Sequence, residues 1–263
     1  MASRATRENK PVKCKYLAGK EIDGNVHAVV IDWLAKVREK FKLQEETLFM
    51  TVAITDHFLP DNPVPETKLQ LISITALFFA SKYKERRSPH IADFSYVTNY
   101  SYLKFQICQM EMMILKALYF FLGFPLRPHF LRTSKIAEVG SKQYVLAKYL
   151  MELCIVDYDM DHLPPSGIAA AVFCLPLKLL DGHELLPSLQ HCMFYTGSDL
   201  LPIMQYMAKN VVLVNKGAAT RRLDSESSKE LCQVDDLFSL VAELRKEGER
   251  LGSTGDSEEE VSW

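Results

Sequence analysis

Apolar residues recur three and four positions apart from residue 26 to residue 41, which predicts a helix with one apolar face. The positions on this predicted face are Val26, Val29, Val30, Trp33, Leu34, Val37 and Phe41. Asp23 or Asn25 can cap the start of the helix, because a short polar side chain accepts a hydrogen bond from a first-turn amide. The same spacing predicts a second helix at residues 44–59, followed by a proline-rich loop that cannot continue it.

The third predicted helix, at residues 67–83, is apolar on nearly every side. Such a helix must be covered by neighbours all round, so we expect it at the centre of a bundle. A short fourth helix is predicted after Ser88, a suitable cap, with Pro89 in its first turn. A fifth helix is predicted at residues 101–118, and its inner face is expected to contain Leu103, Ile107, Met110, Ile114 and Leu118.

The second half of the chain repeats this pattern after a break at residues 123–130. Helices are predicted at residues 128–138, 142–158, 165–180, 186–195 and 198–214, and the third of them is again apolar all round. Pro176 falls inside that third helix and is expected to bend or weaken it. The pattern therefore predicts an all-α chain with two five-helix bundles. The expected divisions are a leader at residues 1–23, bundles at 24–122 and 123–216, and a divergent, partly disordered tail at 217–263.

Composition and charge exclude several classes of protein. The chain has 263 residues, of which 48% are hydrophobic, so it can bury a substantial core. Its formal net charge of -2 does not favour nucleic-acid binding, which needs clustered Lys and Arg. The sequence contains no secretory signal, its apolar stretches are too short to span a membrane, and its six cysteines are scattered. We expect an intracellular protein with neither a nucleic-acid nor a membrane partner.

Motifs that would indicate catalysis are missing from the sequence. There is no phosphate-binding GxxxxGK or GxGxxG, no GxSxG and no HExxH. Asp157, Asp159 and Asp161 alternate as in a calcium-binding loop, but the glycine turn and the closing glutamate of that motif are absent. We therefore interpret these aspartates as a helix end, and we expect no enzyme activity, no metal and no cofactor.

Several long strings occur together that resemble the cyclin family, most closely its B-type members. They are VHAVVIDWLAKV, KLQLISITALFFASKYKE and QICQMEMMILKAL in the first half, and LRPHFLRTSKIAEV, LAKYLMELCIVDYDM and LLPIMQYMAKNVV in the second. The resemblance implies two tandem five-helix cyclin boxes. It also implies a regulatory subunit of nucleus and cytoplasm that binds and activates a cyclin-dependent Ser/Thr protein kinase in G2/M control. Because the family usually carries a longer leader, a shortened N-terminal segment is expected.

Two other functions are consistent with the same fold. A divergent cyclin-fold interaction protein with weak or no kinase activation is the alternative, and departures from the family pattern at His27, Lys84 and Pro176 favour it. A DNA-binding transcription initiation factor with this fold is a third class, which the near-neutral charge disfavours.

The resemblance also implies which residues contact the kinase. Lys82 and Glu111 match the family's kinase-gripping lysine and glutamate, and Tyr83 and Glu85 lie in the same string as the lysine. An ammonium can donate to backbone carbonyls, and a carboxylate can accept from backbone amides. From spacing alone, the pair would be interpreted as an ordinary surface ion pair of little energetic value.

A second implied site is a docking patch for Arg-x-Leu segments of substrates or inhibitors. The matching positions are Val26, Val29, Val30, Trp33 and Gln70, although the simpler interpretation places these residues in the core. Where the family has an arginine that pairs internally with an aspartate, this chain has His27, and we expect a His27–Asp56 pair. Lys36 should repel the arginine of a docking segment, which predicts weak Arg-x-Leu binding.

Overall fold

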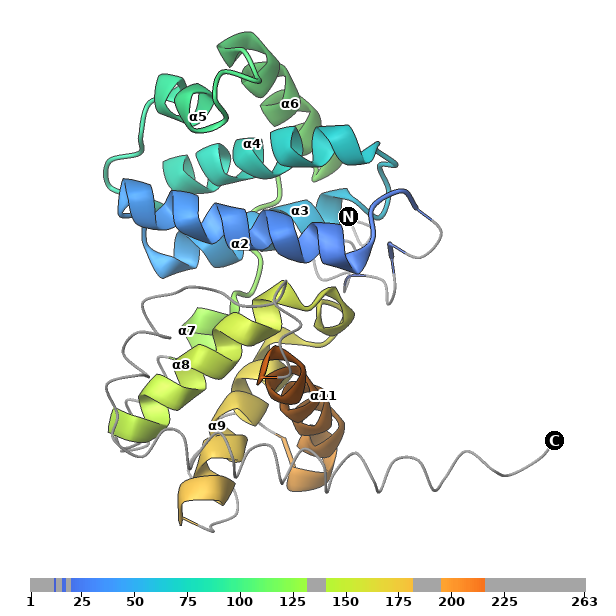
Figure 1. The fold of residues 1–263 in the computed structure, drawn as a ribbon, viewed down its shortest axis with the longest axis vertical. Helices are drawn as coiled ribbons and strands as arrows, with labels where there is room; N and C mark the ends of the chain where they lie inside the picture. The colour runs from blue at the N-terminus through green and yellow to red at the C-terminus, as the bar shows by residue number, and fades with distance from the viewer. Residues whose placement is uncertain (1–11, 13–15, 18–19, 132–140, 182–194, 216–263) are drawn as a thin grey trace, which may run out of the picture. The chain divides into compact units, whose positions relative to one another are not determined.

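The computed structural model describes residues 12, 16–17, 20–131, 141–181 and 195–215. Within these ranges every regular element is a helix, which confirms the predicted all-α class (Figure 1). The chain divides into two compact units, Met1–Leu126 and Arg127–Trp263. Among the described helices, none combines the length and the apolar character that crossing a membrane requires.

The first unit is built around one buried helix. Its described elements are α2 (Gly24–Phe41), α3 (Glu45–Phe58), α4 (Glu66–Lys84), α5 (Ile91–Val97) and α6 (Lys104–Ala117). Helix α4 is buried without interruption from Leu71 to Ser81 and packs against the other four described helices, as its apolar sequence predicts (Figure 1).

Helix α2 begins where the sequence predicts but buries a different face. Asp23, rather than Asn25, caps it, and its Oδ1 accepts a hydrogen bond of 2.7 Å from the Val26 amide. The buried face consists of His27, Ala28, Ile31, Leu34, Ala35 and Val37. Val29 is instead 51% exposed, so the predicted apolar face was wrong in part. Ala28 and Ala35 on the buried side allow close packing. His27 can be buried because Asp56 on α3 is its hydrogen-bond partner.

Two further details of the first unit correct the sequence predictions. Ser88 does not cap α5, because its Oγ lies 2.7 Å from Ser81 Oγ, and the helix starts after His90. On α6 the predicted inner face holds at Ile107, Met110 and Ile114. Leu103 was placed on that face wrongly; it precedes the helix and is 65% exposed.

The second unit repeats the arrangement of a buried helix among covering helices. Its described elements are α7 (Arg127–Leu131), α8 (Ser141–Val156), the 3₁₀ turn η2 (Tyr158–Met160), α9 (Pro165–Asp181) and α11 (Gly197–Asn215). Helix α9 is buried from Ile168 to Leu175 and packs against α7, α8 and α11. The helix predicted at residues 186–195 lies almost wholly outside the described residues, and the predicted tail lies entirely outside them.

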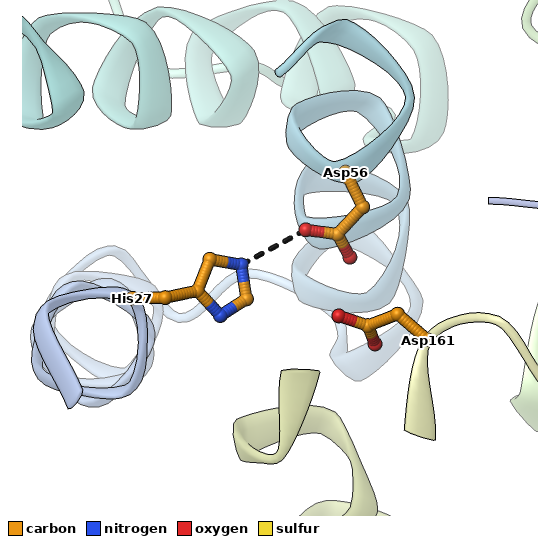
Figure 2. Close-up of side chains that lie close together, drawn as sticks. All are labelled: His27, Asp56 and Asp161. Atoms are coloured by element: carbon orange, nitrogen blue, oxygen red, sulfur yellow. Dashed lines mark hydrogen bonds and ion pairs between the residues drawn. The ribbon is translucent and has the colours of Figure 1, made fainter. Parts of the chain in front are cut away.

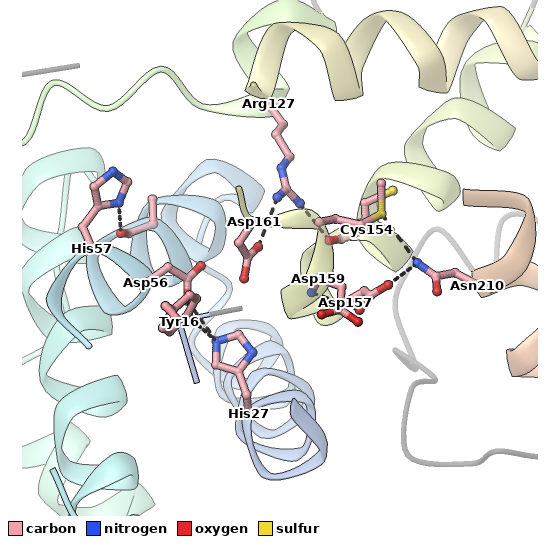
Figure 3. Close-up of polar contacts among 12 residues, drawn as sticks. Tyr16, His27, Asp56, His57, Arg127, Cys154, Asp157, Asp159, Asp161 and Asn210 are labelled. Atoms are coloured by element: carbon pink, nitrogen blue, oxygen red, sulfur yellow. Dashed lines mark hydrogen bonds and ion pairs between the residues drawn. The ribbon is translucent and has the colours of Figure 1, made fainter. Parts of the chain in front are cut away.

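Asp157, Asp159 and Asp161 lie just after the end of α8 in the second unit, as expected for a helix end. Asp157 accepts hydrogen bonds from the Asp159 amide at 3.2 Å and from Asn210 Nδ2 at 2.6 Å. The Arg127 guanidinium donates to the Cys154 carbonyl at 2.9 Å and to Asp161 Oδ1 at 3.2 Å (Figure 3). Burial raises the pKa of the Cys154 thiol to about 12, so it stays protonated and unreactive. These contacts connect α7, α8 and α11 around η2.

Candidate functional site

Lys82 and Glu111 form an ion pair across two packed helices. The Lys82 Nζ of α4 donates a hydrogen bond to Glu111 Oε1 of α6. The lysine side chain is 40% exposed and the glutamate side chain 13%. Among the described residues, no second hydrogen bond to this ammonium is found, and an ammonium carries three donors. The pair can therefore donate to and accept from the backbone of another molecule at the surface.

Aromatic rings lie beneath the ammonium. The Lys82 Nζ is 4.2 Å from the centroid of the Phe78 ring, one turn earlier on α4, and 6.0 Å from the centroid of the Phe79 ring. Both phenylalanines are buried. A cation over an aromatic face is attracted by the ring quadrupole, and an apolar floor strengthens polar contacts made above it.

The C-terminal end of α4 is fixed by contacts with α3. Glu85 Oε1 accepts hydrogen bonds from the Gln44 amide at 2.7 Å and from Thr47 Oγ1 at 2.5 Å, at the start of α3. Lys84 Nζ lies 3.4 Å from Glu46 Oε2. Glu85 therefore has an internal role that the sequence did not reveal, and its contact with a partner stays a prediction. The residue before Lys84, Tyr83, is 56% exposed and available for contact.

Apolar side chains reach solvent on the outer face of α6 and just beyond its end. Those on the helix are Phe105, Met112 and Met113. Tyr119 and Phe120 follow, both more than half exposed and both with positive φ, 53° and 59°. Sequence reasoning missed this surface, although the signal was present as apolar residues off the predicted inner face. Exposed apolar side chains in such number indicate a protein-binding surface.

The predicted docking patch is neither core nor fully exposed. Val29 is exposed, and its partners are half-buried: Val26, Val30, Trp33 and Gln70. Helices α2 and α4 pack together and so bring Gln70 to the same region of the unit. Lys36 Nζ lies 2.7 Å from Asp32 Oδ2, an acidic neighbour that sequence reasoning missed and that offsets the lysine charge.

The structure brings His27 and Asp56 together in the interior. His27 Nε2 lies 2.9 Å from Asp56 Oδ1 (Figure 2), and both residues are buried. The hydroxyl of Tyr16, which the sequence did not indicate, donates to the same Oδ1 at 2.9 Å (Figure 3). The three side chains connect the segment before α2 with α2 and α3, and so hold these parts of the first unit together.

Models of two domain families match consecutive parts of the chain. The N-terminal cyclin domain matches residues 1–123, and the C-terminal cyclin domain matches residues 125–235. The first match lies within the first compact unit, and the second match covers the second unit as far as residue 235.

Curated proteins similar to the chain include G2/mitotic-specific cyclin-B1 from two species. The protein from Xenopus laevis is 53% identical over 215 residues, which cover 81% of this chain and 54% of the relative. The protein from Anguilla japonica is 47% identical over 251 residues, which cover 93% of this chain and 62% of the relative. The chain thus spans a little over half the length of these relatives.

A solved structure shares the fold at low sequence identity. A chain of the yeast RNA polymerase II CTD kinase CTDK-1 complex superposes with a TM-score of 0.68 and 14% identity, covering 90% of this chain and 83% of that one. At this identity the likeness establishes the fold alone.

Proposed function

Because this chain belongs to the cyclin family, we propose that it is a regulatory subunit, not an enzyme, that binds and activates a cyclin-dependent Ser/Thr protein kinase. The observation that carries the proposal is the surface pair of Lys82 and Glu111, held across α4 and α6 over an aromatic floor. Similarity to G2/mitotic-specific cyclins supports a role in G2/M control. Action in nucleus and cytoplasm is part of the proposal.

In the proposed complex, the pair holds the backbone ends of one kinase segment. The Lys82 ammonium donates to carbonyl oxygens, and the Glu111 carboxylate accepts from amides. Tyr83 and Met112, each next to one of the charged residues in sequence, are exposed and would exclude water from these bonds. Activation follows if the kinase conformation that fits this surface is the active one, because a ligand shifts a conformational equilibrium by its differential affinity.

The test is a binding and activation assay with a purified monomeric cyclin-dependent kinase. Lys82→Ala and Glu111→Ala should each weaken binding by about 2 kcal/mol, roughly 30-fold, and reduce histone phosphorylation in parallel. Lys68→Ala and Glu66→Ala are matched controls, since both residues are exposed at the opposite end of α4. They should leave affinity and activation unchanged.

Three outcomes separate the candidate functions. Loss of activation in both site variants, with the controls intact, supports the activator. Binding without activation supports a divergent cyclin-fold interaction protein. If the unmodified chain does not bind the kinase, the proposal is wrong.

We further propose that the α2 patch binds Arg-x-Leu segments of substrates or inhibitors weakly. Exposed Val29 beside half-buried Trp33 offers an apolar anchor point of the kind that short peptide motifs use. The nearby Lys36 disfavours an arginine, and its pairing with Asp32 reduces that effect without removing it.

A further inference from the structure

Of the two phenylalanines beneath the Lys82–Glu111 pair, Phe78 lies nearer to the lysine ammonium. Its ring lies 4.2 Å from the Lys82 Nζ, within the range in which a cation is attracted to an aromatic face. The two residues are four positions apart on α4, so they are neighbours on one helix face. The lysine is therefore held by two contacts of different kinds, the carboxylate of Glu111 and the ring of Phe78.

The Phe78 ring is itself fixed by a series of edge-to-face contacts. Its centroid is 5.2 Å from that of Phe94 on α5, with the planes at 60°. The Phe94 centroid is 5.3 Å from that of Phe41 at the end of α2, with the planes at 61°. Phe94 is completely buried, and this offset geometry is the favoured one for aromatic pairs. Three helices thus determine where the ring under Lys82 lies.

We propose that Phe78 is a positioning residue for the partner-binding lysine, an inference that rests on the proposed function for its consequence in binding. A free lysine side chain loses much rotational freedom when it is fixed in a complex. A ring that holds the ammonium in the unbound chain removes part of that cost in advance. The ring uses none of the three ammonium donors, so the contact persists when those donors turn to a partner.

Phe79 provides the matched control. It is the next residue on α4 and is buried to the same extent as Phe78, each being 8% exposed. Its centroid is 6.0 Å from the Lys82 Nζ, at the outer limit of the attraction. Replacing either phenylalanine by leucine removes a similar amount of aromatic surface, but only Phe78→Leu removes the close ring face.

The first measurement uses the full chain without any kinase. Protons attached to the carbon beside the Lys82 ammonium, observed by NMR, should be shifted upfield by the Phe78 ring current. Phe78→Leu should return them to the position of the other lysines, and Phe79→Leu should not. An unshifted Lys82 resonance in the unmodified chain would overturn the proposal, whatever the chain binds.

The second measurement is kinase affinity in a double-mutant cycle. Phe78→Leu should weaken binding about two- to fivefold, and the effect should disappear in a Lys82→Ala background. An equal loss in Phe79→Leu, or a loss that persists without Lys82, would mean that packing alone is responsible. If the leucine variant fails to fold, pentafluorophenylalanine at position 78 keeps the shape while reversing the ring quadrupole, and it should weaken binding to a similar extent.

These measurements separate this proposal from the proposed function. A shifted Lys82 resonance that depends on Phe78 supports the positioning role even if no cyclin-dependent kinase binds. Kinase binding that is unaffected by either change at position 78 would support the function and contradict the positioning role.

Discussion

His27 illustrates how a single buried polar residue depends on its partners. Its Nε2 and the Tyr16 hydroxyl both lie 2.9 Å from one oxygen, Asp56 Oδ1. His27 and Asp56 are 2% and 3% exposed, so water cannot replace a lost partner. Removing one group therefore costs more than the net value of a hydrogen bond, because the groups that remain lose a buried partner.

We expect Asp56→Ala to lower the free energy of unfolding by about 3 kcal/mol, measured by urea unfolding. The double variant His27→Ala/Asp56→Ala should cost less than the sum of the single changes, by about 1 kcal/mol or more. Tyr16→Phe removes only a hydroxyl and should cost about 1 kcal/mol. Strict additivity of the two alanine changes would show that the pair contributes nothing as a pair.

At the scale of the element, α2 divides its residues between the core and the predicted docking patch. Its buried side faces the bundle through Ala28, Ile31 and Leu34, while Val29 and Lys36 reach solvent. Peptide docking would need apolar side chains at the surface, and α2 carries such side chains outside its buried face. The charge on the same helix then decides which peptides the patch tolerates.

For the α2 patch, Lys36→Glu should tighten the binding of an Arg-x-Leu peptide about fivefold, measured by fluorescence anisotropy. The reason is Coulombic: replacing the repulsive lysine by an anion changes the interaction with the peptide arginine by about 1 kcal/mol in total at an exposed surface. Lys42→Glu makes the same charge change at the exposed C-cap of α2 and serves as the control. Submicromolar binding that Lys36→Glu leaves unchanged would defeat this prediction.

At the scale of the whole molecule, each compact unit has its own buried helix and its own core. The predicted kinase contacts belong to the first unit, through α4 and α6. Asp157 belongs to the second, where its carboxylate caps η2 and accepts a hydrogen bond from buried Asn210 on α11. A substitution of Asp157 should therefore destabilise the core of the second unit.

We therefore expect Asp157→Ala to accelerate amide hydrogen exchange in α8, α9 and α11 and to leave α3 and α4 protected, as followed by mass spectrometry. Loss of the buried acceptor should destabilise the second unit by about 2 kcal/mol, since Asn210 loses its carboxylate partner. Equal acceleration in both units would show that they unfold as one cooperative body.

Within the part of the chain that the structure describes, hydrophobic spacing alone indicated which segments are helices and which of them are central. The continuous apolar runs of α4 and α9 required cover on all sides, and both helices are buried in the structure. Family resemblance predicted that Lys82 and Glu111 contact a kinase, because their spacing by itself indicates only a surface ion pair.

Tertiary structure decided the partners of individual side chains. Which face of α2 is buried, the capping of α3 by Glu85, and the ring beneath Lys82 that Phe94 holds in place all depend on residues distant in sequence. The physical reason is that hydrophobic periodicity shows only which side of a helix faces water on average. A hydrogen bond or a ring contact requires two particular groups to lie next to each other. Only the packing of one helix against another determines which groups those are.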